Sequence, residues 1–228
     1  MLRRIALGIL LYSFVAQAQA PVVPVAGEPV NLNEVKTKLI AYHDCSMPTC
    51  YVPQIERQSN KAIGLLKSSV AKAKPGAKLA LVLDIDETSL SNWDEEKQDD
   101  FGYVAADWNA WVKKRAAPAI AGTLRLYQEA EKDHVAVFFI TGRGEGQRED
   151  TETNLKAVGY TQWDGLALRR ADHPKTQTTV EYKSGERAKV VAKGYTIVLN
   201  VGDQFSDLKG NPMAEHSVKL PNPFYLIP

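Results

Sequence analysis

Three short apolar segments, each ending in polar side chains, constrain the fold of this chain of 228 residues. They lie in Leu79–Thr88 (LALVLDIDET), Val135–Arg143 (VAVFFITGR) and Tyr195–Asp207 (YTIVLNVGDQFSD). Apolar runs that do not alternate with polar residues are typical of strands buried on both faces of a parallel sheet. Segments with helical periodicity separate these runs, so the sequence predicts a three-layer α/β fold built on a parallel sheet.

Helices and two shorter strands complete the predicted order of elements. Helices are expected over residues 31–43, 51–74, 120–132, 147–158 and 181–193, with short strands at 165–168 and near residue 217. The two N-terminal helices, within residues 31–74, precede the first core strand. Residues 90–118 are acidic at first and then aromatic, which indicates a small helical cap inserted near the mouth of the site. The acidic run itself favours a solvated loop over a second metal site.

Polar side chains follow the carboxyl ends of the three core strands. Asp84 and Asp86 follow the first strand, and Thr141 follows the second. Asp203 and Asp207 follow the third. In open α/β sheets the ligand site lies beyond these strand ends. An acidic turn that begins a helix would explain the first pair alone, but it would not explain the ordered set.

The aspartates fit phosphoryl transfer through a covalent intermediate. Asp84 ends a rigid strand and is the candidate nucleophile, which would form an aspartyl-phosphate. Asp86 is the candidate acid and base for the leaving group and for water. The carboxylates of Asp84 and Asp203 and the Asp86 carbonyl are expected to hold one Mg²⁺ per chain. Asp207 is expected to orient a ligand water from behind them.

Three further residues are candidate contacts for the phosphoryl group. Thr141 and the backbone amides near Gly142 can donate hydrogen bonds to its oxygens. Lys183, at the start of a helical segment, would stabilise the charge of the transition state. Taken alone, Lys183 would be a solvated helix lysine, and only its place in the ordered set favours a role in the site.

Three tryptophans in the insertion are candidates for stacking on the leaving group. Trp93, Trp108 and Trp111 could contact a nucleotide base or an aromatic ester at the mouth of the site. The alternative is that these indoles form the core of the cap.

Several longer motifs in the chain together are typical of one protein family. They are DIDETSLSNW (84–93), Trp108-x-x-Trp111, FFITGR (138–143), LALR (166–169), YKS (182–184) and GDQFSD (202–207). In this combination the chain resembles the acid phosphatase branch of the haloacid dehalogenase (HAD) superfamily, which contains bacterial class C nonspecific acid phosphatases and plant acid phosphatase and vegetative storage protein relatives.

The resemblance implies a fold and an activity. It implies a Rossmann-like HAD core over residues 21–228 with a small helical cap. It also implies export and Mg²⁺-dependent hydrolysis of small phosphomonoesters such as nucleotides. A phosphotransferase that uses the same intermediate, or a non-catalytic storage or binding protein on this fold, remains an alternative.

The N-terminus and the overall charge indicate where the protein acts. Residues 1–20 read as a signal peptide with a basic start, an apolar stretch and the cleavage site Ala18-Gln19-Ala20. The alternative is an uncleaved membrane anchor, but the apolar stretch is short for a span. No lipid-attachment cysteine follows it, so we expect a periplasmic or secreted protein without a stable membrane anchor. The formal net charge of +1 argues against a nucleic-acid polymer as partner.

Two cysteines are consistent with an oxidising compartment. Cys45 and Cys50 flank four residues, and in such a compartment they can form a local disulfide. Free thiols are an alternative. A zinc site that borrows His43 or Asp44 is another, but two cysteines without a second pair are a poor zinc signal.

Overall fold

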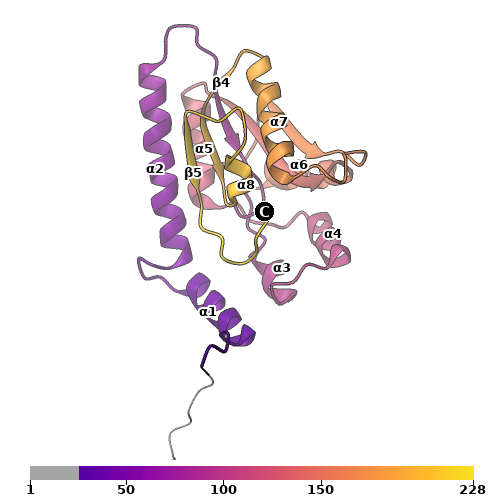
Figure 1. Ribbon diagram of the computed structural model, residues 1–228. Coiled ribbons are helices and arrows are strands. Elements are labelled where there is room, and N and C mark those ends of the chain that lie inside the picture. Colours follow the sequence, from indigo (N-terminus) through magenta and orange to yellow (C-terminus); the bar gives the residue numbers. More distant parts are fainter. Residues whose placement is uncertain (1–25) are drawn as a thin grey trace, which may run out of the picture. The chain divides into compact units, whose positions relative to one another are not determined.

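Five parallel strands, in the order β3-β2-β1-β4-β5, form the sheet of this protein (Figure 1). The structure is a computed structural model, in which residues 26–228 are described. The strands are β1 (Leu79–Leu83), β2 (Ala136–Gly144), β3 (Gly165–Arg169), β4 (Thr196–Gly202) and β5 (His216–Lys219). The predicted α/β fold with a parallel sheet is therefore confirmed. The predicted signal peptide, residues 1–20, lies outside the described residues.

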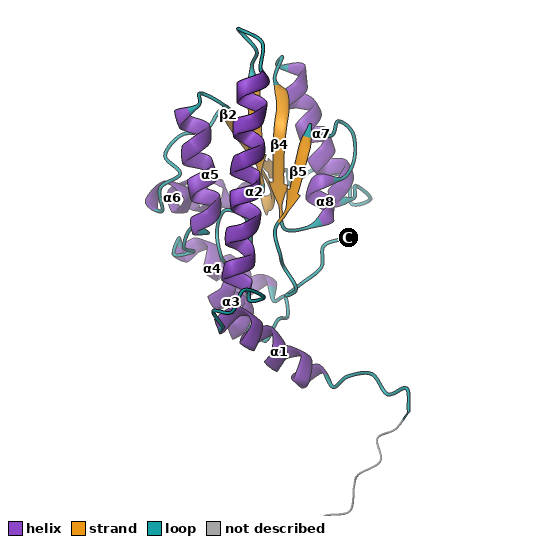
Figure 2. Cartoon of the chain, turned by 90° about the vertical axis from the view of Figure 1, so that its left-hand side faces the viewer, coloured by secondary structure: helices purple, strands orange, loops and turns teal. Residues whose placement is uncertain are grey.

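Helices cover both faces of the sheet, which makes three layers. The helices α2 (Tyr51–Lys72), α5 (Ala121–Lys132) and α6 (Arg148–Ala157) pack on one face, and Figure 2 shows α2 and α5 on the near side of the sheet. The helix α7 (Thr179–Ala192) packs on the other face. Side chains alternate between the faces, so Leu81 points to the α2 side and Val82 to the α7 side. Both sets are apolar, which explains the non-alternating runs in the sequence.

An insertion follows β1 at the carboxyl end of the sheet. Residues 90–118, which we call the cap, contain the helices α3 (Trp93–Gln98) and α4 (Ala105–Lys114), seen beyond the strand ends in Figure 1. Hydrogen bonds close its base, because the Ser91 N–H donates to the Pro118 carbonyl at 2.9 Å and the Ile120 N–H to the Ser89 carbonyl at 3.0 Å. The chain thus leaves the core and re-enters it at one place.

The acidic run of the cap differs from the expected solvated loop. Asp94 is exposed, but Glu95 and Glu96 are only 5% and 8% exposed. The run forms the helix α3, and one face of this helix turns toward the site. The expectation of a solvated loop is therefore wrong for Glu95 and Glu96.

The first helix, α1 (Leu32–Asp44), is tied to α2 by a disulfide between Cys45 and Cys50, whose Cα atoms are 5.7 Å apart. Near this link the ring of His43 stacks on that of Trp93, with centroids 3.6 Å apart. Both sulfurs are used in the disulfide, so they form no zinc site. Within residues 26–228, none of the helices has both the length and the apolar character needed to cross a membrane.

Candidate active site

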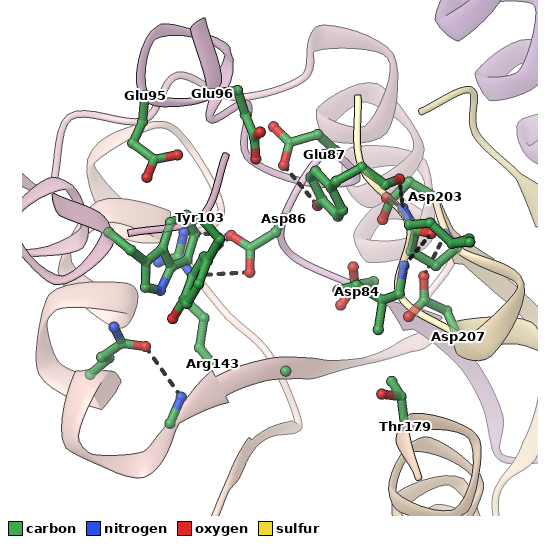
Figure 3. A pocket seen from close by; sticks show the side chains of 18 of the residues that line it. Asp84, Asp86, Glu87, Glu95, Glu96, Tyr103, Arg143, Thr179, Asp203 and Asp207 are labelled. Atoms are coloured by element: carbon green, nitrogen blue, oxygen red, sulfur yellow. Dashed lines mark hydrogen bonds and ion pairs between the residues drawn. The ribbon is translucent and has the colours of Figure 1, made fainter. Parts of the chain in front are cut away.

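Four aspartates meet at the carboxyl ends of the central strands β1 and β4. Asp84 and Asp86 follow β1, Asp203 follows β4, and Asp207 lies in the short helix α8 (Phe205–Leu208). Leu83 and Val201 are partners in the parallel register, and this pairing brings the two strand ends together. All four aspartates line one cavity of about 820 Å³, shown in Figure 3. A cavity therefore lies at the edge of the sheet where the sequence predicts the site.

Three of these carboxylates form a cluster that could hold a metal ion. Oxygen atoms of Asp84, Asp203 and Asp207 all lie within 4.8 Å of one another, and all three residues are buried. The Thr88 hydroxyl donates to Asp203 Oδ1 at 3.1 Å, and the Asn222 amide donates to Asp203 Oδ2 at 2.7 Å. These bonds fix the orientation of Asp203 before any ligand arrives.

Lys183 is the cation of this cluster. Its Nζ donates to Asp84 Oδ1, lies 3.0 Å from Asp207 Oδ1 and donates to the Ile140 carbonyl at 2.7 Å. Burial alone lowers the pKa of Lys183. The Asp207 and Asp84 carboxylates outweigh that effect and raise its pKa above the ordinary value. Lys183 therefore stays charged beside the candidate nucleophile.

A capping box explains why α7 begins where it does. The Thr178 hydroxyl accepts the Glu181 N–H at 3.1 Å, and the Glu181 carboxylate accepts the Thr178 N–H at 2.8 Å. The sequence prediction started this helix at Glu181. The Thr178-x-x-Glu181 spacing in the sequence indicates a helix that begins directly after Thr178, as the structure shows.

The charge of the cluster fits a hard divalent cation. Burial, followed by the Asp207 charge, raises the pKa of Asp84 well above its ordinary value, although Lys183 opposes this. Burial and Asp207 also raise the pKa of Asp203 to about 6. Three buried carboxylates with one ammonium group are an oxygen donor set in need of positive charge, which suits a hard divalent cation.

Two of the predicted ligand roles can be compared with this geometry. Asp207 is predicted to orient a ligand water, and one of its carboxylate oxygens lies within 4.8 Å of those of Asp84 and Asp203. The Asp86 carboxylate lies outside the cluster, so only its carbonyl remains for the predicted ligand role.

The Asp86 carboxylate is held by a clamp of buried donors. Arg143 donates to Asp86 Oδ1 from Nη2 at 2.7 Å and from Nε at 3.0 Å, and the Asn92 amide donates to the same oxygen at 3.0 Å. The Arg143 side chain is 1% exposed. The clamp aims Asp86 into the cavity, as Figure 3 shows. The sequence analysis placed Arg143 in the FFITGR motif but gave it no role.

Asn92 links this clamp to the cap and to the C-terminal segment. Its backbone N–H donates to Glu87 Oε1 at 2.6 Å, and its side-chain oxygen accepts the Trp111 indole N–H at 2.8 Å. The Tyr225 hydroxyl donates to Glu87 Oε2 at 3.0 Å. Glu87 adopts a φ of 50°, which is uncommon for a residue with a side chain. This network holds that backbone conformation next to Asp86.

Thr141 and Gly142, both in β2, differ in their exposure to the cavity. Gly142 lines the cavity. Thr141 is fully buried and is not among the lining residues. Its hydroxyl accepts the Arg143 N–H at 3.1 Å and lies 3.5 Å from Asp86 Oδ2.

Only one of the three tryptophans lines the cavity. Trp108 does so, with the Arg143 guanidinium 5.4 Å from its ring centroid. Trp93 instead stacks on His43, and the Trp111 indole N–H donates a hydrogen bond to the Asn92 side chain. Trp93 and Trp111 are not among the residues that line the cavity and instead pack against the hydrophobic core, which favours the alternative for these two indoles.

The whole sequence points to one family. It matches the family described as HAD superfamily, subfamily IIIB (acid phosphatase), over residues 17–228. It is 41% identical over 181 residues to Acid phosphatase 1 of Solanum lycopersicum, which covers 78% of this chain and 69% of that protein. The chain belongs to the HAD superfamily, subfamily IIIB. The predicted resemblance to the acid phosphatase branch, and with it the class of phosphomonoesterases, is confirmed at the level of the family.

Some plant relatives have names that do not refer to catalysis, and one of them is named for storage. The Stem 28 kDa glycoprotein of Glycine max is 38% identical over 150 residues, and Vegetative storage protein 1 of Arabidopsis thaliana is 35% identical over 151 residues. Each match covers 64% of this chain, but only 59% and 55% of these relatives. A class C acid phosphatase from Bacillus anthracis shares the fold, with a TM-score of 0.70, 23% identity and 86% of both chains covered.

The C-terminal segment is a part of this subfamily IIIB site that the sequence did not predict. Tyr225, Leu226 and Ile227 line the cavity, and the Ile227 N–H donates to the Gln204 side chain at 3.2 Å. Asn222 reaches Asp203, as described above. No motif distinguishes this segment from an ordinary proline-rich tail.

Arg187 is a second unpredicted support. It is fully buried and donates to the carbonyls of Asp207, Pro212, Lys209 and Gly210. The bonds to Asp207 and Pro212 are 2.7 and 2.9 Å long. This guanidinium fixes the helix α8, which carries Asp207, and the loop that follows it against α7.

Proposed function

We propose that this protein is an exported, Mg²⁺-dependent acid phosphatase that hydrolyses small phosphomonoesters, nucleotides among them, through an aspartyl-phosphate. The observation that carries the proposal is the placement of Asp84. It ends β1, faces the cavity and contacts the buried ammonium of Lys183. A carboxylate held in this way, beside a positive charge, is suited to attack a phosphorus atom.

The first half of the reaction forms the intermediate. An Asp84 oxygen bonds to phosphorus while the bond between phosphorus and the ester oxygen breaks. Asp86, in its protonated form, gives its proton to the leaving oxygen. Lys183 and the backbone around Gly142 neutralise the charge on the phosphoryl oxygens. Thr141 remains a predicted phosphoryl contact.

The second half restores the enzyme. Asp86, now a carboxylate, takes a proton from water, and the water oxygen attacks the phosphorus and releases Asp84 with inorganic phosphate. Arg143 and Asn92 keep Asp86 at the same place in both steps. The carboxylates of Asp84, Asp203 and Asp207, with the Asp86 carbonyl, would hold the Mg²⁺. When bound, this ion neutralises the repulsion between the carboxylate nucleophile and the phosphate.

The size and lining of the cavity support an organic leaving group. A volume of about 820 Å³ exceeds the needs of a phosphate group. Trp108 and the 74%-exposed Tyr103 present ring surfaces to it. Aromatic surfaces of this kind suit stacking by a nucleotide base. The signal-like N-terminus and the disulfide support export.

The decisive experiment is turnover of a chromogenic phosphate ester by the purified mature protein, with Mg²⁺ and with EDTA. We expect Asp84→Asn to remove turnover by several orders of magnitude, because the amide is not a nucleophile. Asp86→Asn should slow esters with poor leaving groups by about 10²–10⁴-fold and should affect good leaving groups less. Asp94→Asn, an exposed change in the same cap, is the matched control.

Two outcomes contradict the proposal. Substantial activity of folded Asp84→Asn protein, with deamidation excluded by mass spectrometry, rules out the aspartyl-phosphate. Absence of turnover in the wild-type protein with Mg²⁺ would favour a storage role like that named for the plant relatives. Added alcohol separates hydrolysis from transfer, because a phosphotransferase would yield the new phosphate ester.

A further inference from the structure

Two buried carboxylates without partners face the cavity from the cap. Glu95 and Glu96 are 5% and 8% exposed, and both line the cavity. In the described part of the chain neither carboxylate has a hydrogen bond or an ion pair. Figure 3 shows them on the cap side of the cavity, with their carboxylates directed toward the space around Asp86. Buried carboxylates are almost always paired, so this pair needs an explanation.

The surroundings of the pair are acidic. Burial, followed by the charges of Asp99, Asp86 and Asp107, raises the pKa of Glu95 to about 7. Burial and the charges of neighbours that include Glu95 and Asp86 raise the pKa of Glu96 to about 8. A buried charge among like charges is unfavourable unless a cation joins it.

The cations of the cavity are already engaged. Arg143 is bonded to Asp86, and Lys183 lies between Asp84 and Asp207. The metal cluster uses carboxylates at the strand ends, whereas Glu95 and Glu96 belong to the cap. Among residues 26–228 no other Lys or Arg side chain lines the cavity, so a cation that pairs with Glu95 and Glu96 has to come from outside the chain.

We propose that Glu95 and Glu96 form a leaving-group subsite that selects phosphomonoesters whose alcohol carries an ammonium group. This inference rests on the proposed function, since only a phosphatase would place a leaving group there. Two carboxylates accept charge-assisted hydrogen bonds from an ammonium group. Phe101, Tyr103 and Trp108 line the same cavity and add the ring surfaces on which organic cations bind.

The test compares esters that differ only at the far end of the alcohol. Full-length mature protein with Mg²⁺ is assayed on ω-aminoalkyl phosphates, and on ω-hydroxyalkyl and ω-carboxyalkyl phosphates of the same chain length, over a series of lengths. The pH is kept about one unit above the higher of the two pKa values, about 7 for Glu95 and about 8 for Glu96, so that most of both carboxylates are ionised. At the best length we expect kcat/KM for the amine to exceed that for the alcohol by about 10- to 100-fold, the range expected for hydrogen bonds to charged groups. The carboxylate ester should be the poorest substrate.

Variants of Glu95 and Glu96 test whether these two residues cause the preference for the aminoalkyl phosphate. In the double variant Glu95→Gln, Glu96→Gln, the ratio of kcat/KM for the aminoalkyl phosphate to kcat/KM for the hydroxyalkyl phosphate should approach one. The amide side chains keep the shape of the two residues but carry no charge. Asp94→Asn on the same helix, exposed and outside the cavity, should keep the wild-type ratio. The double variant is expected to fold, because it removes two unpaired buried charges, and thermal unfolding checks this.

The possible failures can be told apart. Hydrolysis of all the esters at equal rates by the wild-type protein overturns this inference and leaves the phosphatase intact. Failure to hydrolyse any of them, or a chromogenic ester, overturns the proposed function instead. Calorimetric titration with Mg²⁺ provides the third outcome. A second bound ion that disappears in the double variant would make the pair a metal site and overturn the subsite.

Discussion

Replacing Glu96 by Gln should make the protein more stable, and the gain should depend on pH. The pKa of Glu96 rises from its ordinary value of 4.5 to about 8, because the side chain is buried and Glu95, Asp86, Asp203 and Asp99 surround it with negative charge. The folded state therefore holds this proton more tightly than the unfolded state does. Stability is lost as pH rises from about 4.5 to about 8, where the unfolded chain has released the proton and the folded chain retains it.

The size of the effect follows from the same two values. One pH unit corresponds to about 1.4 kcal/mol, so the interval from 4.5 to about 8 sets an upper limit of about 5 kcal/mol. We expect about 2–4 kcal/mol, because water that reaches the cavity screens part of the charge. Glu96→Gln removes this penalty, since the amide stays neutral at every pH.

Urea unfolding in EDTA measures the prediction. The free energy of unfolding is determined at about pH 4.5 and about pH 8.5 for wild type, Glu96→Gln and the exposed control Asp94→Asn. The first two proteins should agree at the lower pH and diverge at the higher, with Glu96→Gln more stable. Parallel pH profiles for the wild type and Glu96→Gln would refute the reasoning, since they would mean that the Glu96 carboxylate is solvated or paired in the folded protein.

Two further predictions concern Gly202 and the disulfide. A Cβ at Gly202 would lie 2.5 Å from the Cβ and Oδ2 atoms of Asp207, so Gly202→Ala should cost about 1–3 kcal/mol of stability and weaken Mg²⁺ binding measured by calorimetry. Gly64→Ala is its control, because nothing lies within 4 Å of that Cβ, and unaltered Mg²⁺ affinity in Gly202→Ala would contradict the packing argument. The double change Cys45→Ser, Cys50→Ser should lower the free energy of unfolding by about 2 kcal/mol, the loop-closure value for so short a loop. Equal urea midpoints for this variant and the wild type would show that the link adds no stability.

The core of the fold and the aspartates of the candidate site could be predicted because local pattern determines them. Strands buried on both faces give continuous apolar runs, and parallel strands bring their carboxyl ends to one edge. Asp84, Asp86 and Asp203 follow from those two rules, and Lys183 follows from its place in the ordered set of motifs. The structure brings all four to one cavity. Residue spacing was sufficient for this part of the site.

The surrounding residues depend on long-range packing, which a single sequence does not encode locally. Tyr225 reaches Glu87 from 138 residues away, and Arg143 reaches Asp86 from 57. Trp93 does not line the cavity, and its ring instead stacks on that of His43 in the N-terminal helix α1. The prediction for the acidic run of the cap was wrong for a related reason. A charge run is usually solvated, and only the position of the cap over the cavity buries Glu95 and Glu96.

The paired hydrogen bonds at the base of the cap also make it an exchangeable unit. The Ser91–Pro118 and Ser89–Ile120 bonds fix the distance between the two ends of the insertion, whatever lies between them. An exchanged cap whose ends form the same two hydrogen bonds would join the core at the same place. The graft would have to retain Asn92 and an indole at position 111, because their hydrogen bond joins the cap to Asp86. With those two residues kept, the residues of the cap that line the cavity could be exchanged while Asp84, Asp203 and Asp207 stay in place at the strand ends.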